Sequence, residues 1–569
     1  NLDLPHTDAH VTMPAYRTLA EWEARKQSLK QQILSAAGLL PLPEKTPLGP
    51  QIFGRIEHPD YSIEKVLLET MPGYYLGGNL FRPLGKGGKR PAVASPHGHW
   101  TYGRLEHQPL ASIPARGISL ARQGYVVFTY DMVGYNDTAQ TPHVFGGRRE
   151  QLWGFGPLGL QLWNSIRVVD FLESLPDVDP SRIAATGASG GGTQVFLLTA
   201  VDDRVKVSAP VNMISALMQG GSPCENAPGL RIRASNLEFG AVMAPRPMLM
   251  VSATGDWTRN TPAEEFPAIR GIYQLYGQPG NLEQVQIDAP HNYNQASREA
   301  VYRFFGKHVL GDPDPTHFAE QTIRVEKLQD MLALHGRALP DNALNYRQLL
   351  EQWIRAAKRQ NDATRDPRTL RERLALALAV EWPASVQLSS SGDAVTITRP
   401  DRGHRIPGLW KPGPGVPLLV VHAQGAKAAM ASPVAAETLR TGRPVLAIDA
   451  FETGAAVAVR PAPKRHHLTF NPSDDASRVQ DILTALAFLE TTGAREVRLA
   501  GIGDAGLWCL FAAAVARVPV ALSADLAGFT GEDSQFEQRF FVPGIQRAGG
   551  LRAALRLRAA LRFTRKEPE

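Results

Sequence analysis

Short apolar runs alternate with helix-like stretches between residues 51 and 315, and this alternation is the clearest pattern in the chain. Several of the runs are apolar throughout, as expected for strands buried on both faces of a sheet. Strands are expected over residues 65–70, 91–95, 125–130, 183–186, 205–210, 247–252 and 285–289, with helices between them, for example over 117–123, 162–175 and 264–275. The pattern predicts an α/β fold built on a doubly wound, mostly parallel sheet.

The sequence on either side of this region has a different character. Residues 1–50 predict an N-terminal helical extension, with one helix over 19–39 and a proline-rich link after it. Residues 316–385 are rich in Arg, Leu and Gln with helical spacing, which predicts a helical linker. The α/β alternation returns over 386–569. Since a chain of 569 residues is long enough for two or three domains, we expect separate α/β domains over 51–315 and 386–569.

Residues 187–191 carry the sequence Gly-Ala-Ser-Gly-Gly between an expected strand and an expected helix. This is the G-x-S-x-G pattern of a nucleophile elbow, a tight turn that strains the serine and exposes its hydroxyl above the sheet. The glycines let the strand and the helix pack closely around the turn. Five common residues match by chance easily, so Ser189 becomes a candidate nucleophile only if an acid and a base follow it.

An acidic residue and a histidine follow at two later strand ends. A serine hydroxyl needs a base to remove its proton and an acid to hold that base in the right tautomer. Asp256 comes just after the expected strand 247–252, and His291 just after 285–289. The order Ser, Asp, His is the one that this fold uses. Asp288 is a rival acid; a turn-forming aspartate and a hydrogen-bonded loop histidine are the structural alternatives.

The negative charge that forms during acyl transfer needs N–H donors fixed in advance. The first expected donor is the backbone of Gly190, directly after the serine. The second is expected from the loop after strand 91–95, at His99 or Trp100. His97 and His99 do not predict a metal site, because further ligands and supporting carboxylates are not apparent nearby. No metal and no cofactor are expected.

With these residues in place, the chain resembles the α/β-hydrolase superfamily, and within it the acetyl xylan esterase and dienelactone-hydrolase-like branch. The matching features are the His-Gly loop at 97–98, the Tyr130-Asp131 strand end followed by Gly134, the elbow, and the acid and base positions. The resemblance covers residues 50–310 and implies esterase activity through an acyl-enzyme. Prolyl-peptidase-type and glucuronoyl-esterase-type enzymes also carry their nucleophile on an elbow of this kind.

The second α/β region repeats landmarks of the first in the same order. The run 417–421 before a histidine corresponds to 91–95, and the run 444–448 before an aspartate corresponds to 125–129. Aligned without gaps, Gly503 falls opposite Ser189. The second copy keeps the turn without the nucleophile and ends before both later strands could follow. We interpret residues 386–569 as a truncated, degenerate, non-catalytic hydrolase-like domain that contacts the first; two unrelated α/β domains are the alternative.

Several side chains near the expected strand ends are candidates for substrate binding. Aromatic residues there would form a platform for a sugar ring, although aromatic side chains more often belong to the core. The loop 219–233 follows the strand after the elbow, and its Glu225 or Arg231 would bind a polar or acidic substrate, unless it is a simple surface loop. The aromatic candidates are Trp100, Tyr135, Trp153, Trp257 and Tyr293.

Composition and charge exclude several other classes of protein. The net charge of +6 is small for this length and the basic residues are scattered, so nucleic-acid binding is not expected. No apolar run approaches the roughly 18 residues that span a bilayer, so no membrane partner is expected. Cys224 and Cys509 lie in different regions and cannot build a disulfide framework. The chain begins at Asn1 without Met, which fits removal of a signal peptide and a secreted or periplasmic location.

Taken together, the residues and the resemblance predict a serine ester hydrolase that acts on a small acyl ester, with acetyl groups on a plant polysaccharide as the expected substrate. In this hypothesis Ser189 is the nucleophile, His291 the base and then the acid, and Asp256 the residue that orients His291. The same machinery would also suit a peptide, a lactone or a glucuronoyl ester. A carbohydrate-binding or scaffold protein with a residual hydrolase fold is the alternative from another class.

Overall fold

Residues 51–290 form a nine-stranded sheet in the order β1-β2-β3-β7-β4-β8-β9-β10-β11, within a computed structural model that describes residues 4–85 and 87–563. The strands up to β7 pair antiparallel, and the pairs from β7 to β11 are parallel. The mostly parallel sheet predicted from the sequence is therefore confirmed. The strands are β1 (Gln51–Glu57), β2 (Tyr61–Met71), β3 (Tyr74–Pro83), β4 (Arg90–Pro96), β7 (Val126–Tyr130), β8 (Val178–Ala188), β9 (Val205–Val211), β10 (Met248–Gly255) and β11 (Leu282–Pro290).

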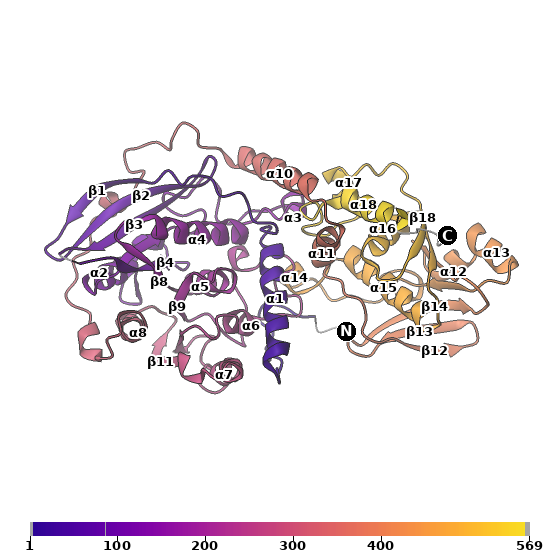
Figure 1. Cartoon of the computed structure of the whole chain (residues 1–569), viewed down its shortest axis with the longest axis horizontal. Coiled ribbons are helices and arrows are strands. Elements are labelled where there is room, and N and C mark those ends of the chain that lie inside the picture. The colour runs from indigo at the N-terminus through magenta and orange to yellow at the C-terminus, as the bar shows by residue number, and fades with distance from the viewer. Residues whose placement is uncertain (1–3, 86, 564–569) are drawn as a thin grey trace, which may run out of the picture. The chain divides into compact units, whose positions relative to one another are not determined.

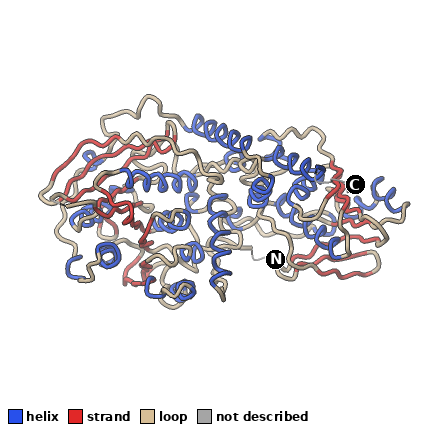
Figure 2. The backbone as a smooth tube through the Cα atoms, in the orientation of Figure 1, coloured by secondary structure: helices blue, strands red, loops and turns tan. Residues whose placement is uncertain are grey.

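Helices cover this sheet (Figures 1 and 2). The helices α2 and α8 share an apolar cluster with side chains of the central strands, such as Val93, Val127 and Val251. The helices α4 and α5 pack against β4 and β8. The helix α1 begins at a capping box formed by Thr18 and Glu21. The helices of the larger unit include α1 (Leu19–Ala36), α2 (Ile113–Arg122), α4 (Pro157–Ser174), α5 (Gly190–Val201), α6 (Asn236–Ala241), α7 (Glu265–Leu275) and α8 (Gln295–Phe305).

The contacts of the chain group it into two compact units. The larger one comprises Pro5–Gly146 and Phe155–Gln352, and holds the nine-stranded sheet. The smaller one is built from Gly147–Gly154 and the described residues from Trp353 onward. In it, Trp153 donates through Nε1 to Asp533 over 2.9 Å, which ties the short helix α3 (Arg148–Leu152) to that unit. The four segments expected from the sequence stay a prediction about domain boundaries.

The expected helical linker is only partly helical. Between residues 316 and 345 the described chain is mostly irregular, with α9 (Leu328–Met331) as a single turn of helix. Asp137 accepts hydrogen bonds from the backbone N–H groups of Ala333 and Leu334, and Asn79 donates to the Met331 carbonyl over 2.8 Å. Because side chains of the larger unit satisfy this backbone, it does not need helical hydrogen bonds. The longer helices come later, as α10 (Tyr346–Ala363) and α11 (Pro367–Leu378).

The smaller unit contains a seven-stranded sheet in the order β12-β13-β14-β16-β15-β17-β18 among its described residues. Its antiparallel and parallel pairs occur in the same sequence as those of the first seven strands of the larger sheet. The described residues contain no counterpart of β10 and β11 in this second sheet. The strands are β12 (Gln387–Ser391), β13 (Ala394–Arg399), β14 (His404–Lys411), β15 (Leu418–His422), β16 (Val445–Ile448), β17 (Val497–Ile502) and β18 (Val520–Ala524).

The turn between β17 and α16 (Ala505–Val515) corresponds to the elbow after β8. Gly503 there has a φ of +61°, against +60° for Ser189. The repeated strand order and the shared turn support the interpretation of an internal repeat, and a hydrolase ancestry for the second copy stays a prediction. The other helices of this unit are α12 (Ala426–Met430), α13 (Pro433–Arg440), α14 (His467–Phe470), α15 (Asp474–Thr491), α17 (Asp533–Arg539) and α18 (Gly550–Phe563).

Among the described residues, no helix combines the length and the apolar character needed to cross a membrane.

Candidate active site

Ser189 lies at the turn between β8 and α5 with a φ of +60° and a ψ of −128°. An L-amino acid rarely adopts this backbone region, and it persists only where the surrounding structure enforces it. The serine N–H donates to the carbonyl of Val211 on the neighbouring strand β9 over 3.0 Å, which fixes the turn. The side chain is half-buried. The strained, accessible serine that the pentapeptide predicts is therefore present in the backbone geometry.

The glycines of the elbow are required by close backbone approaches. A Cβ added at Gly187 would lie 2.8 Å from the carbonyl oxygens of both Gly191 and Pro96. A Cβ at Gly190 would lie 2.6 Å from the imidazole Cε1 of His99. The turn thus brings β4, β8, α5 and the His99 ring within van der Waals contact.

Gly187→Ala is expected to lower the free energy of unfolding by about 1–3 kcal/mol, because the added methyl group would push two backbone carbonyls apart. The matched control is Gly271→Ala on α7, where a Cβ would meet nothing within 4 Å. Removing a helix glycine there is expected to be neutral or stabilising. Thermal unfolding followed by circular dichroism measures both variants. Equal melting temperatures for the two would contradict this account of the elbow.

Asp256 and His291 form a hydrogen-bonded pair at the ends of β10 and β11. The Nδ1 atom of His291 donates to Oδ2 of Asp256 over 2.7 Å. The other carboxylate oxygen of Asp256 accepts from the backbone N–H and the hydroxyl of Thr258, over 2.7 and 2.6 Å. Because Nδ1 carries the proton in this pair, the lone pair of Nε2 is free to act as a base. That Nε2 atom is buried and has no hydrogen-bond partner among the described residues.

The rival acid Asp288 has a different environment. It is exposed on β11, and its Oδ1 atom accepts from the hydroxyl of Thr254 over 2.7 Å. Asp256, by contrast, has a side chain only 2% exposed and faces the His291 ring directly. The geometry favours Asp256 as the residue that orients His291.

The elbow and the pair lie at the same edge of the sheet. Strands β8, β9, β10 and β11 are consecutive parallel neighbours, so their carboxyl ends meet at one edge, where ligands bind in open α/β sheets. A Cβ at Gly98 would lie 2.9 Å from Cβ of Ser189, and the Trp100 ring stacks on the His291 ring at 6.1 Å between centroids. The loop 97–100 therefore contacts both the serine and the histidine. The catalytic roles of the three residues stay a prediction.

Of the backbone N–H groups expected to stabilise the oxyanion, those of Gly190 and His99 stay candidates and that of Trp100 does not. Gly190 is the first residue of α5, where backbone N–H groups have no partner inside the helix. The N–H of Trp100, however, donates to the carbonyl of Gly98 over 2.9 Å. That turn removes Trp100 from the set of candidate donors and leaves the backbone of His99 as the second one.

His97 fixes this loop through the hydrogen bonds of its ring. Its Nδ1 atom donates to the carbonyl of Gly98 over 2.7 Å, and its Nε2 atom accepts from the N–H of Met132 over 2.9 Å. Burial of the ring lowers the pKa of His97 to about 3. Both nitrogens are used by backbone groups, so His97 ties the loop after β4 to the loop after β7 and offers no free atom to a ligand.

The acid sensitivity of the fold is expected to depend on His97. An unfolded histidine has a pKa of about 6.5, and the folded pKa is about 3. The unfolded state therefore binds the proton first, and the wild type loses stability as the pH falls through this window. His97→Gln does not titrate, so the gap in melting temperature between wild type and variant should narrow from pH 7 to pH 4. A gap that stays constant or widens would contradict the buried, neutral histidine.

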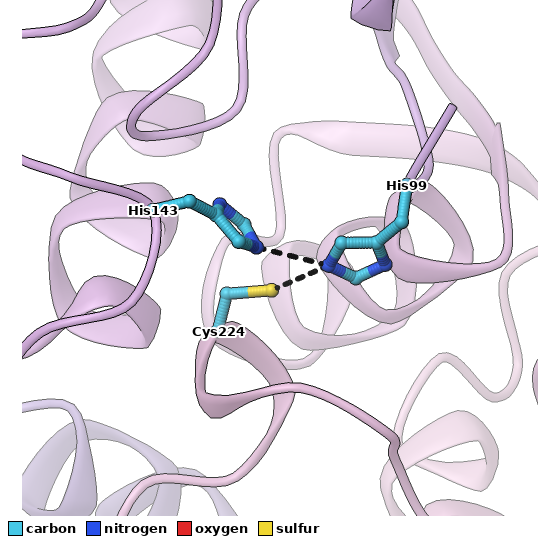
Figure 3. Close-up of side chains that lie close together, drawn as sticks. All are labelled: His99, His143 and Cys224. Atoms are coloured by element: carbon cyan, nitrogen blue, oxygen red, sulfur yellow. Dashed lines mark hydrogen bonds between the residues drawn. The ribbon is translucent and has the colours of Figure 1, made fainter. Parts of the chain in front are cut away.

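One group of side chains in the described part of the chain has the composition of a metal site. His99, His143 and Cys224 each offer one ligand atom, and these atoms lie within 4.8 Å of one another (Figure 3). Sequence reasoning missed His143 and Cys224 as site residues. They come from two different loops, and no motif spacing connects them to His99.

Comparison with known proteins agrees with this fold. The solved structure of "Methylesterase BT1017" superposes with a TM-score of 0.53 at 30% sequence identity, over 61% of this chain and 78% of that one. The chain belongs to the α/β-hydrolase superfamily. "Putative hydrolase YtaP" of Bacillus subtilis (strain 168) is 27% identical to this α/β-hydrolase over 287 residues, which cover 47% of this chain and 94% of that protein. No protein-family model matches the chain.

A second curated relative is "Polyketide transferase claH" of Penicillium crustosum. It is 31% identical over 158 residues, which cover 27% of this chain and 45% of that protein. The alignment therefore spans less than half of the fungal protein.

Three of the expected substrate-binding residues do surround the site of the hydrolase. Trp257 lies against His291, with 4.3 Å between ring centroids, and Trp100 stacks on the same His291 ring at 6.1 Å. Tyr135 meets the His143 ring edge-on at 5.1 Å. All three residues are half-buried, and the two tryptophans contact the ring of the catalytic candidate His291.

The other expected substrate-binding residues are buried and already have partners, which corrects the prediction. Tyr293 is 2% exposed and its hydroxyl bonds to the hydroxyl of Thr186 over 2.7 Å. Glu225 is 3% exposed, and its carboxylate accepts from Gly221, Ser222 and Thr193. Arg231 is 2% exposed and donates to Glu225, Asn226 and Asn236. Glu225 and Arg231 therefore hold the loop 219–233 together. Trp153 belongs to the other unit.

Proposed function

We propose that this α/β-hydrolase is a serine carboxylic-ester hydrolase that works through an acyl-enzyme. The observation that carries the proposal is the 2.7 Å bond between His291 Nδ1 and Asp256 Oδ2, at the strand ends beside the strained Ser189. A histidine held in this tautomer, with a buried and unpartnered Nε2 atom, is equipped to take a proton from a nearby hydroxyl.

The chemistry follows from the roles of these residues. Ser189 Oγ attacks the ester carbonyl while His291 Nε2 takes its proton, and Asp256 stabilises the imidazolium that forms. The N–H groups of Gly190 and His99 would stabilise the oxyanion. His291 then returns the proton to the leaving alcohol, and a water molecule repeats the sequence to release the acid.

The proposed substrate is an ester on a plant polysaccharide or its oligosaccharides. The half-exposed rings of Trp100, Trp257 and Tyr135 supply flat surfaces on which sugar rings stack, which supports a carbohydrate ester. An acetyl ester is the first candidate. The 30% identity to "Methylesterase BT1017" favours a methyl ester as the second. A polymeric plant substrate would also fit a secreted or periplasmic location.

The experiment compares released products under identical conditions. The purified hydrolase is incubated with acetylated xylan, methyl-esterified polygalacturonan, a glucuronoyl ester, a lactone and a chromogenic peptide. Release of acetate or methanol without peptide cleavage supports the esterase proposal and identifies the ester. Cleavage of the peptide alone would contradict the esterase proposal and indicate a peptidase. If the folded protein hydrolyses none of the esters and no peptide, a binding or scaffold role is favoured.

A further inference from the structure

We propose that His99, His143 and Cys224 bind one transition-metal ion of the zinc class beside the nucleophile elbow. The proposal goes beyond the esterase activity and does not depend on it. The expectation of no metal considered only His97 and His99. The donor set proposed here is two imidazole nitrogens and one thiol sulfur. Soft thiolate and imidazole donors select zinc-like ions, whereas calcium and magnesium take oxygen ligands.

Two of the three distances between the donor atoms are close to those of a tetrahedral site, and the third, between His143 Nε2 and Cys224 Sγ, is within 4.8 Å. The Nε2 atom of His99 lies 3.1 Å from Nε2 of His143 and 3.1 Å from Sγ of Cys224. Around a tetrahedral zinc ion the corresponding separations are about 3.3 Å between two nitrogens and about 3.5 Å between nitrogen and sulfur. Widening the two His99 separations by a few tenths of an ångström would therefore bring them to the tetrahedral values.

Three separate loops bring the donor atoms together. His99 follows β4, His143 lies in the loop after β7, and Cys224 lies in the short 3-10 helix Pro223–Glu225. Figure 3 shows both rings and the thiol directed at a common point. The His99 ring is exposed, His143 is half-buried and Cys224 is buried, so an ion can reach the site from solvent on one side.

The contacts around the trio orient the donors. His143 Nδ1 donates to the carbonyl of Val133 over 2.7 Å, because a carbonyl oxygen can only accept. The proton on Nδ1 leaves the Nε2 lone pair directed at the other two donors. A backbone carbonyl in this position is a common outer partner of metal-binding histidines. The His99 ring is held against Gly190, where a Cβ would lie 2.6 Å from Cε1.

Cys224 is supported by a rigid turn. Glu225, the next residue, accepts from the N–H groups of Gly221 and Ser222 and from the Thr193 hydroxyl of α5. This fixes the thiol relative to the elbow helix, as a site on a preorganised scaffold requires. The Ser222 hydroxyl lies 3.3 Å from His143 Nε2 and adds an oxygen atom beside the trio.

The alternative is that hydrogen bonds alone join the three side chains, with His99 Nε2 donating to His143. The surrounding contacts would then be the same.

A measurement of metal binding distinguishes a metal site from a hydrogen-bonded trio. The full-length protein, without a histidine tag, is treated with a chelator, dialysed and titrated with Co²⁺. The proposal expects one ion per chain and a thiolate-to-cobalt charge-transfer band in the near ultraviolet, both displaced by Zn²⁺. Zinc should also raise the melting temperature.

The matched controls use the two cysteines of the chain. Cys224→Ala should abolish the charge-transfer band and the zinc-dependent rise in melting temperature. Cys509→Ala, in the buried helix α16, should keep both. If Cys224→Ala does not fold, His143→Gln carries the same expectation. Folded wild type that binds no cobalt, or a band that persists without Cys224, would overturn the proposal; neither result depends on hydrolysis of an ester.

Discussion

Ser189→Ala is expected to lower kcat by about four to six orders of magnitude, the loss found when the nucleophile of a serine triad is removed. Alanine keeps the Cβ atom and the backbone conformation with φ +60°, so the fold should survive. The oxyanion donors and the substrate pocket would remain and account for the residual rate. Initial rates with 4-nitrophenyl acetate, together with circular dichroism of both proteins, measure the effect.

The control for this variant uses the second elbow. Gly503→Ser places a serine at the corresponding turn, whose φ is +61°. Because the described residues contain no strands after β18 to carry an acid and a base, the added serine should not restore activity to Ser189→Ala. A Ser189→Ala variant that keeps more than a small fraction of the activity would place the nucleophile elsewhere. A rescue by Gly503→Ser would contradict the interpretation of the second copy as non-catalytic.

Asp256→Asn is expected to reduce kcat/KM by about 10⁴-fold, because an asparagine amide can donate to Nδ1 and stabilise the wrong tautomer of His291. Asp288→Asn is the matched control, since it makes the same chemical change one strand away. Its side chain is exposed and bonds to Thr254, so its kcat/KM should stay close to that of wild type.

Equal losses in the two variants, or a larger loss for Asp288→Asn, would contradict the assignment of Asp256. The comparison measures orientation of the base rather than overall stability, because both variants can be checked for the same melting temperature. His291→Ala should show a loss comparable to that of Ser189→Ala, since nucleophile and base act as one unit.

Much of the fold could be predicted because a buried strand can be recognised from the residues of its own segment. Strands buried on both faces are continuous apolar runs, and residues 91–95, 125–130 and 247–252 all fall largely within observed strands. The antiparallel strands β1 and β3 were missed. β1 is mostly half-buried or exposed, and β3 contains Gly77 and Gly78, so neither resembles a buried strand in sequence.

The acid and the base could be located because each follows a strand end. Burial of polar side chains could not be foreseen. Glu225 and Arg231 looked like substrate contacts, yet they satisfy backbone groups inside their own loop. A sequence shows that a charged residue lies in a loop, but the direction of its side chain depends on partners from elsewhere in the fold.

The trio of His99, His143 and Cys224 was beyond sequence reasoning for the same reason. Metal motifs are recognised when two ligands share a helix or a turn at fixed spacing. Here each donor comes from a different loop after a different strand. Only the sheet topology, which places those loops at one edge, brings the three atoms within 4.8 Å.

Covalent labelling by a fluorophosphonate, followed by mass spectrometry of the digested protein, tests the central claim most directly. The predicted result is one adduct per chain, on the peptide that contains Ser189, and no adduct in the Ser189→Ala variant. Folded wild type that takes up no label, or an adduct on any other residue, would contradict the assignment of Ser189 as the nucleophile.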